Sequence, residues 1–80
     1  MLTISVISPE AVLFEGQSDS VVAPAFDGEV GILTGHAPMM TLLGKGELRL
    51  GTGSRFQVEG GFLQVVDDQV RVVTEHASKI

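Results

Sequence analysis

The sequence has no cysteine, tryptophan or tyrosine, and only four of its 80 residues are phenylalanine. Without cysteine there is no disulfide framework, no thiolate metal site and no thiol nucleophile. Small extracellular domains usually depend on such cross-links, so we expect a reducing compartment inside the cell. With so few aromatic side chains, little is available to stack on nucleic-acid bases.

Basic residues are scarce as well. Five Lys and Arg stand against ten Asp and Glu, which gives a formal net charge of −5. All the basic residues follow position 44, so residues 1–44 carry the whole acidic excess. This balance argues against a nucleic-acid partner, which needs a basic surface. The acidic half either keeps the protein in solution or attracts a basic partner.

Long apolar runs are also missing. Every apolar stretch is far shorter than the roughly 20 residues that span a bilayer, and residues 1–5 hold no basic segment of the kind that opens a signal peptide. A chain of 80 residues has room for one hydrophobic core. We therefore expect a single soluble, intracellular domain over residues 1–80, without insertion into a membrane.

Short strands are predicted along almost the whole chain. Residues 2–8 alternate between apolar and polar, which places Leu2, Ile4 and Val6 on one face. Val12 and Phe14 are expected to share a face in the next strand, and Pro24 is expected to end the third. About nine strands separated by Gly and Pro predict an all-β fold, an antiparallel β-sandwich or flattened barrel. Residues 75–80 lose the alternation and are predicted to begin a tail or a linker.

Few residues suggest chemistry. Glu29 and His36 are the only acid and imidazole in one irregular region, and a small hydrolase built on them stays open as an alternative. Together with Asp27 and His76 they match no zinc-ligand spacing. The glycine-rich segments lack the pattern of a phosphate-binding loop and fit turns instead. From the residues alone we predict no catalytic, cofactor or metal site, and a small acidic β-sandwich binding module.

One segment is more specific. Residues 28–43, GEVGILTGHAPMMTLL, resemble the signature G-E-[ILV]-G-I-x-x-G-H-A-P-[LM]-[LM]-T-x-L of the epsilon subunit of F-type ATP synthases. Residues 46–50 are similar to the G-x-[ILV]-R-[ILV] that follows it, and residues 56–65 to its F-x-[LV]-x-G-G-[FI]-L-[EQ]-V element. Residues 2–16 resemble the family's opening. Residues 70–77 resemble its ending, although Glu75 and His76 replace the usual Ala-Asp.

The resemblance implies a flattened β-sandwich of two five-stranded sheets that acts in the central stalk of the synthase without catalysis or cofactor. Its partners would be the gamma subunit and the cytoplasmic loops of the c-ring, which typically carry Arg. The family pattern implies c-ring contacts at Gly28, Glu29, Gly31 and His36. It implies a gamma contact near Thr41. Because two packed sheets leave outer faces, we also expect Met39, Met40, Leu43 and Val73 either to face gamma or to fill the core.

The resemblance also sets limits. A typical epsilon subunit continues into a C-terminal helical hairpin, and this chain ends where that part would start, so neither hairpin inhibition nor ATP sensing is expected of residues 1–80. The implied location is the cytoplasmic face of the bacterial plasma membrane, as a peripheral part of the synthase. A free-standing β-sandwich binding module, unrelated to ATP synthase, remains the alternative.

Overall fold

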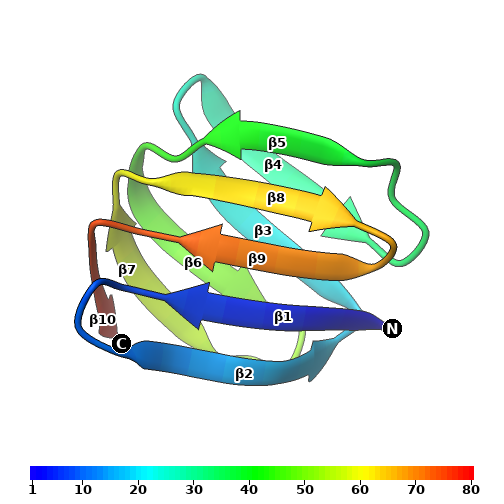
Figure 1. The fold of residues 1–80 in the computed structure, drawn as a ribbon, viewed down its shortest axis with the longest axis horizontal. Helices are drawn as coiled ribbons and strands as arrows, with labels where there is room; N and C mark the ends of the chain where they lie inside the picture. Colours follow the sequence, from blue (N-terminus) through cyan, green and yellow to red (C-terminus); the bar gives the residue numbers. More distant parts are fainter.

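In the computed structural model, which describes residues 1–80, the chain forms ten strands and no helix (Figure 1). The strands are β1 (Leu2–Ile7), β2 (Val12–Ser18), β3 (Ser20–Ala25), β4 (Gly28–Leu33), β5 (Met39–Leu42), β6 (Lys45–Leu50), β7 (Arg55–Glu59), β8 (Phe62–Val66), β9 (Gln69–Val73) and β10 (His76–Lys79). No residue therefore belongs to a helix that is long and apolar enough to cross a membrane.

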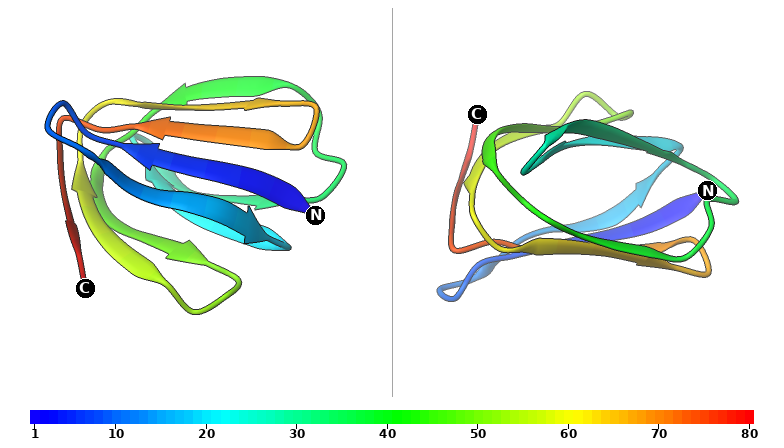
Figure 2. Two further views of the ribbon diagram at one scale, coloured as in Figure 1. Left: turned by 60° about the horizontal axis from the view of Figure 1, so that its bottom comes forward. Right: turned by 90° about the horizontal axis from the view of Figure 1, so that it is seen from above.

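The strands make two five-stranded sheets that lie face to face, as the view from above shows (Figure 2). Sheet A has the order β2-β1-β9-β8-β5, and sheet B has the order β10-β7-β6-β3-β4. All neighbouring strands are antiparallel except β1 and β9, which run parallel and bring residues 3–7 beside residues 69–73. The predicted β-sandwich of two five-stranded sheets is confirmed, with this one parallel pair added.

The core lies between the sheets, because apolar and polar residues alternate along the strands and the apolar ones point inward. In β1 the side chains of Leu2, Ile4 and Val6 are fully buried, as predicted. On the neighbouring strand β9, the side chains of Val70 and Val72 are also buried in the core. Fifteen buried hydrophobic residues form one cluster. Because inward positions alternate with outward ones, each sheet also presents an outer face.

The prediction that Val12 and Phe14 share a face is wrong, because the pairing of β1 with β2 shifts by one residue. Val6 lies opposite Phe14, whereas Ile7 lies opposite Val12, so Leu13 is the extra residue of a β-bulge. Phe14 consequently points inward and packs edge-on against Phe56, with ring centroids 6.0 Å apart. Val12 points outward and is 56 % exposed.

Two further boundaries differ from the expectation. Pro24 does not end the third strand, since β3 continues through it to Ala25. Pro24 pairs with Glu29 of β4, while the ladder between β3 and β6 covers only Val21 and Val22. A missing N–H is tolerated where a strand has a partner on one side only. Residues 76–79 form β10 against β7 and are neither tail nor linker.

Candidate functional site

The outer face of sheet A carries an apolar row that crosses all five strands. The registers align Leu42 with Phe62, Phe62 with Val73, Val73 with Ile7, and Ile7 with Val12. Each of the three central members follows or precedes a fully buried residue of its own strand, so these side chains point away from the core. We call Leu42, Phe62, Val73, Ile7 and Val12 the apolar row.

The two ends of the apolar row are the most accessible. Leu42 is 62 % exposed, and Val12 at the opposite edge of the sheet is also largely exposed. Phe26, in the turn between β3 and β4, lies beside the β5 end, because its N–H donates to the carbonyl oxygen of Leu42 at 3.0 Å. Phe26 is itself exposed. The three central members are partly buried, so the row is most exposed at its two ends. Large exposed apolar patches are typical of surfaces that contact a partner.

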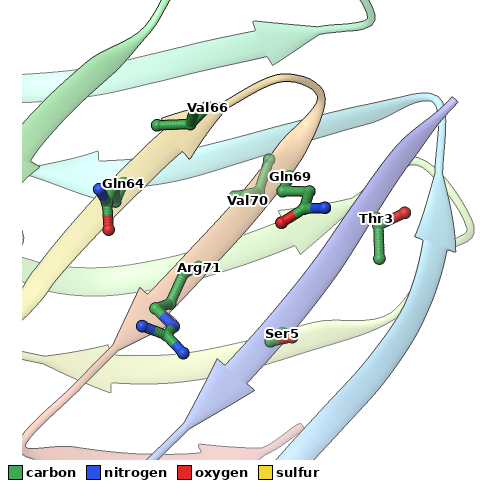
Figure 3. Close-up of a pocket in the computed structure, with 7 residues that line it drawn as sticks. All are labelled: Thr3, Ser5, Gln64, Val66, Gln69, Val70 and Arg71. Atoms are coloured by element: carbon green, nitrogen blue, oxygen red, sulfur yellow. The ribbon is translucent and has the colours of Figure 1, made fainter.

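A polar hollow lies next to the apolar row on the same face (Figure 3). It has a volume of about 410 Å³, and β1, β8 and β9 supply its walls. The lining residues are Thr3, Ser5, Gln64, Val66, Gln69, Val70 and Arg71. The registers place Arg71 between Ser5 and Gln64, one row along from Val73. Arg71 is the only charged residue in the lining.

The outer face of sheet B is different, because charged side chains pair across it. Arg49 of β6 donates to Glu29 Oε2 of β4 at 3.1 Å, over the intervening β3. Arg55 Nη1 lies 3.7 Å from Glu47 Oε1. The side chains of Arg49 and Glu29 are 47 % and 62 % exposed, so water screens this ion pair. Glu29 is thus accessible, and a basic group within the chain already contacts it.

The residues predicted to contact the c-ring follow the edge of sheet B. Gly28, Glu29 and Gly31 belong to β4, which is the edge strand, and all are exposed. His36 lies beyond the far end of β4, in the loop before β5, and its Nδ1 is 2.6 Å from the carbonyl oxygen of Ala37. At about 3.3 Å per residue, β4 alone separates Glu29 from Leu33 by about 13 Å. The structure therefore does not bring Glu29 and His36 together. They do not have the close arrangement that a hydrolase built on these two residues would need.

The loop that carries His36 is tied to sheet A. Asp68, in the turn between β8 and β9, accepts the N–H of Gly35 on its Oδ1 at 2.7 Å. The carbonyl oxygen of Leu33 accepts the N–H of His36 at 3.1 Å. No three His, Asp or Glu side chains gather as metal ligands would, and this includes His36, His76, Asp27 and Glu29.

The residues predicted near gamma divide between the two sides of β5. Met40 is exposed on the outer face, beside the apolar row. Leu43 is only 5 % exposed and belongs to the core, while Met39 packs against the core from its rim. Thr41 is half-buried. Val73, the other residue left open between core and surface, points outward.

Four members of the apolar row, Leu42, Ile7, Val12 and Phe62, and also Arg71 were not among the predicted contact residues. Ile7, Val12 and Phe62 each look like ordinary strand residues in the sequence, because alternation shows only that two sides exist. Their alignment depends on four strand pairings and on the bulge at Leu13. Only knowledge of the strand order could have revealed it.

Comparison with known proteins identifies the family. Residues 1–80 match the family model described as "ATP synthase, Delta/Epsilon chain, beta-sandwich domain". The chain belongs to this family. The resemblance noted in the sequence is thereby confirmed over its full length.

Curated relatives of this ATP synthase family are substantially similar to the chain. The ATP synthase epsilon chain of Leptospira borgpetersenii is 44 % identical over 80 residues, covering 96 % of this chain and 63 % of the relative. The epsilon chain of Rhodopirellula baltica is 48 % identical over 75 residues, covering 90 % of this chain and 59 % of the relative. The chain therefore spans about three fifths of the length of these curated relatives.

Two solved structures share the fold. A chain of the Euglena gracilis mitochondrial ATP synthase, solved as OSCP/F1/c-ring, superposes with a TM-score of 0.88 at 21 % identity, covering 98 % of this chain and 52 % of that one. A chain of the central stalk/c-ring of the Tetrahymena thermophila enzyme gives 0.79 at 16 % identity, covering 96 % and 65 %. At such identities the likeness establishes the β-sandwich fold.

Proposed function

We propose that the chain is a non-catalytic subunit of the central stalk of an F-type ATP synthase. In this role it docks on the gamma subunit and on the c-ring, and helps couple ion-driven rotation to ATP synthesis. It acts at the cytoplasmic face of the bacterial plasma membrane as a peripheral component. The observation that carries the proposal is the match of residues 1–80 to the delta/epsilon β-sandwich domain.

The apolar row supports a gamma contact on sheet A. A protein face that keeps an apolar line in water gains free energy when a partner covers it, at about 25 cal/mol per Å² of apolar area removed from water. Met40 lies beside this line and Val73 is part of it. Thr41, the gamma contact implied by the family pattern, lies opposite the buried Leu63 on the inner side of β5 and stays a prediction. Met39 and Leu43 contribute from the inner side, by holding β5 against the core.

The edge of sheet B supports a c-ring contact through Gly28, Glu29, Gly31 and His36. No lysine or arginine precedes position 44, so basic loops would meet an acidic edge strand. The ion pair with Arg49 holds the Glu29 carboxylate on the outer face of sheet B. Because this pair is exposed, an arginine of the c-ring can share or replace the contact at small cost.

Binding to the gamma subunit tests the gamma contact. We expect the folded chain to form a 1:1 complex with purified gamma, measured by gel filtration and calorimetry. Leu42→Ser should weaken the complex by about tenfold, because the loss of a buried leucine in an interface costs at least about 1.4 kcal/mol. Leu33→Ser is the matched control, since Leu33 is 64 % exposed but lies on the outer face of sheet B.

Two results would contradict the proposal. A folded wild-type chain that does not bind gamma favours a free-standing binding module. Equal effects of Leu42→Ser and Leu33→Ser would mean that the outer face of sheet A is not the contact.

A further inference from the structure

Five polar side chains around the hollow make no side-chain hydrogen bond or ion pair within the chain. They are Thr3, Ser5, Gln64, Gln69 and Arg71, from β1, β8 and β9 (Figure 3). By contrast, Arg49 and Arg55 on sheet B each have an acidic partner. The hollow therefore collects hydrogen-bond donors that are available to something outside the chain.

Arg71 forms no ion pair on its own face. Its neighbours along the row are Ser5 on β1 and Gln64 on β8, both uncharged. Glu15 belongs to the same row. It lies on β2, where it pairs with Ser5 of β1, and β2 is two strands away from β9. The backbones of β9 and β2 are about 10 Å apart, as those of β6 and β4 are, but Glu15 and Arg71 form no ion pair, unlike Glu29 and Arg49. In a protein with a net charge of −5, this is a local positive site.

The hollow is too close to the apolar row to stay uncovered when a partner docks. Arg71 and Val73 are two residues apart on β9, which is about 7 Å along the strand. A partner segment that covers the apolar row also covers part of the hollow. An arginine that loses its water without gaining a partner opposes binding strongly. The docking segment must therefore supply an acceptor at this place.

We propose that Arg71 receives a carboxylate of the gamma subunit, an Asp or Glu that lies about 7 Å from the apolar side chains covering the row. This inference rests on the proposed function and adds the chemistry of the contact. The guanidinium binds both carboxylate oxygens in its planar fork. Gln64, Ser5 and Gln69 stand around the same hollow as further donors. The carboxylate fixes the register of a contact that apolar side chains alone leave free to slide.

Charge removal at Arg71 tests the inference. Calorimetry measures the affinity of the chain for purified gamma at about 0.05 M and about 0.5 M salt, two conditions that differ strongly in screening. We expect Arg71→Gln to weaken binding by about tenfold at low salt, and to flatten the salt dependence, as for a close interfacial charge pair. Arg71→Lys keeps the charge without the fork and should fall between wild type and Arg71→Gln.

Arg55→Gln is the matched control, because Arg55 is also an exposed arginine but lies on sheet B. It should bind gamma within about twofold of wild type. Wild-type affinity and salt dependence in Arg71→Gln, beside a clear loss in Leu42→Ser, would overturn the carboxylate site and leave the proposed function intact. Equal losses in Arg71→Gln and Arg55→Gln would also overturn it, since only overall charge would matter. No binding by the folded wild type would overturn both proposals.

Discussion

Gly61 is the residue at which a single methyl group meets the strongest obstacle. It joins β7 to β8 with φ +98°, and a Cβ added there would lie 1.9 Å from the carbonyl oxygen of Val73 and 2.7 Å from the Cα of Thr74. Both obstacles are backbone atoms of the segment that ends β9, so neither can rotate away. Gly53 has nearly the same φ, +100°, but nothing lies within 4 Å of its added Cβ.

The two glycines make a matched pair for a stability measurement. Gly53→Ala should cost about 1–2 kcal/mol, the strain of an alanine at positive φ. Gly61→Ala should cost at least about 2 kcal/mol more, because the strands must also move apart. Urea unfolding followed by far-UV circular dichroism measures both, since the chain has no tryptophan for fluorescence. Equal losses would show that the backbone at Gly61 relaxes freely.

The turn between β8 and β9 has two residues with positive φ, and one of them also holds the loop of His36 through a hydrogen bond, here called the tether. Val66 pairs with Gln69, so Asp67 and Asp68 are the two turn residues, and both have positive φ, 50° and 61°. Such turns prefer Asn-Gly or Asp-Gly. An aspartate at the second position is explained by its contact, because Asp68 Oδ1 accepts the N–H of Gly35. The hairpin thus holds the loop of His36 in place.

Asp68→Gly should separate the two roles. The turn receives its preferred residue, so the free energy of unfolding should change by less than about 1.5 kcal/mol. The Gly35 amide loses its acceptor and should exchange its hydrogen about fivefold faster or more, measured by nuclear magnetic resonance. Asp67→Gly changes the same turn without the tether and should leave the exchange rate of Gly35 as it is. Unchanged exchange in Asp68→Gly would mean that the contact does not order the loop.

Elements differ in how far their sequence determines them. β1 was predictable because one of its faces is fully buried, and Leu2, Ile4 and Val6 alternate accordingly. β2 was not, because a bulge at Leu13 reverses the sides while the residue types stay apolar. β10 has no apolar alternation to detect, and its pairing with β7 defines it. The type of element followed from pattern, whereas side and register required the neighbouring strand.

The candidate site was predictable only where it lies within one segment. Gly28, Glu29 and Gly31 share one strand, and the family signature covers them together with His36. The pairing of Glu29 with Arg49 joins residues 20 positions apart, through a strand order that the sequence does not reveal. The apolar row needs four registers at once. The sequence therefore did not predict which residues of distant strands lie side by side.

At the scale of the whole molecule, the two outer faces are chemically opposite. Sheet A presents an apolar row and one unpaired arginine, whereas sheet B presents paired charges along β4, β6 and β7. Val12 and Glu29 lie on edge strands of different sheets, Val12 on β2 and Glu29 on β4. In Figure 1, β2 and β4 lie at opposite ends of the stack of strands. This difference between the two faces is the basis for the proposed binding of two partners at the same time.

The two proposed contacts should therefore be separable by mutation. Val12→Ser should weaken binding to gamma by several-fold and leave c-ring binding unchanged, because Val12 contributes only apolar area. Glu29→Lys should do the reverse, with its effect on c-ring binding largest at low salt. Glu47→Lys controls for charge reversal elsewhere on sheet B, where Glu47 faces Arg55. Pull-down of each folded variant with purified gamma and with detergent-solubilised c-ring measures the two affinities.

Independence also predicts how the changes combine. Substitutions more than about 10 Å apart without shared partners add to within about 0.5 kcal/mol. Four strand spacings of about 4.8 Å, nearly 20 Å, separate the edges to which β2 and β4 belong. The double variant should lose gamma affinity as Val12→Ser does and c-ring affinity as Glu29→Lys does. If either single change weakened both complexes equally in a folded protein, one shared surface would have to serve both partners, and the division between the two faces would be wrong.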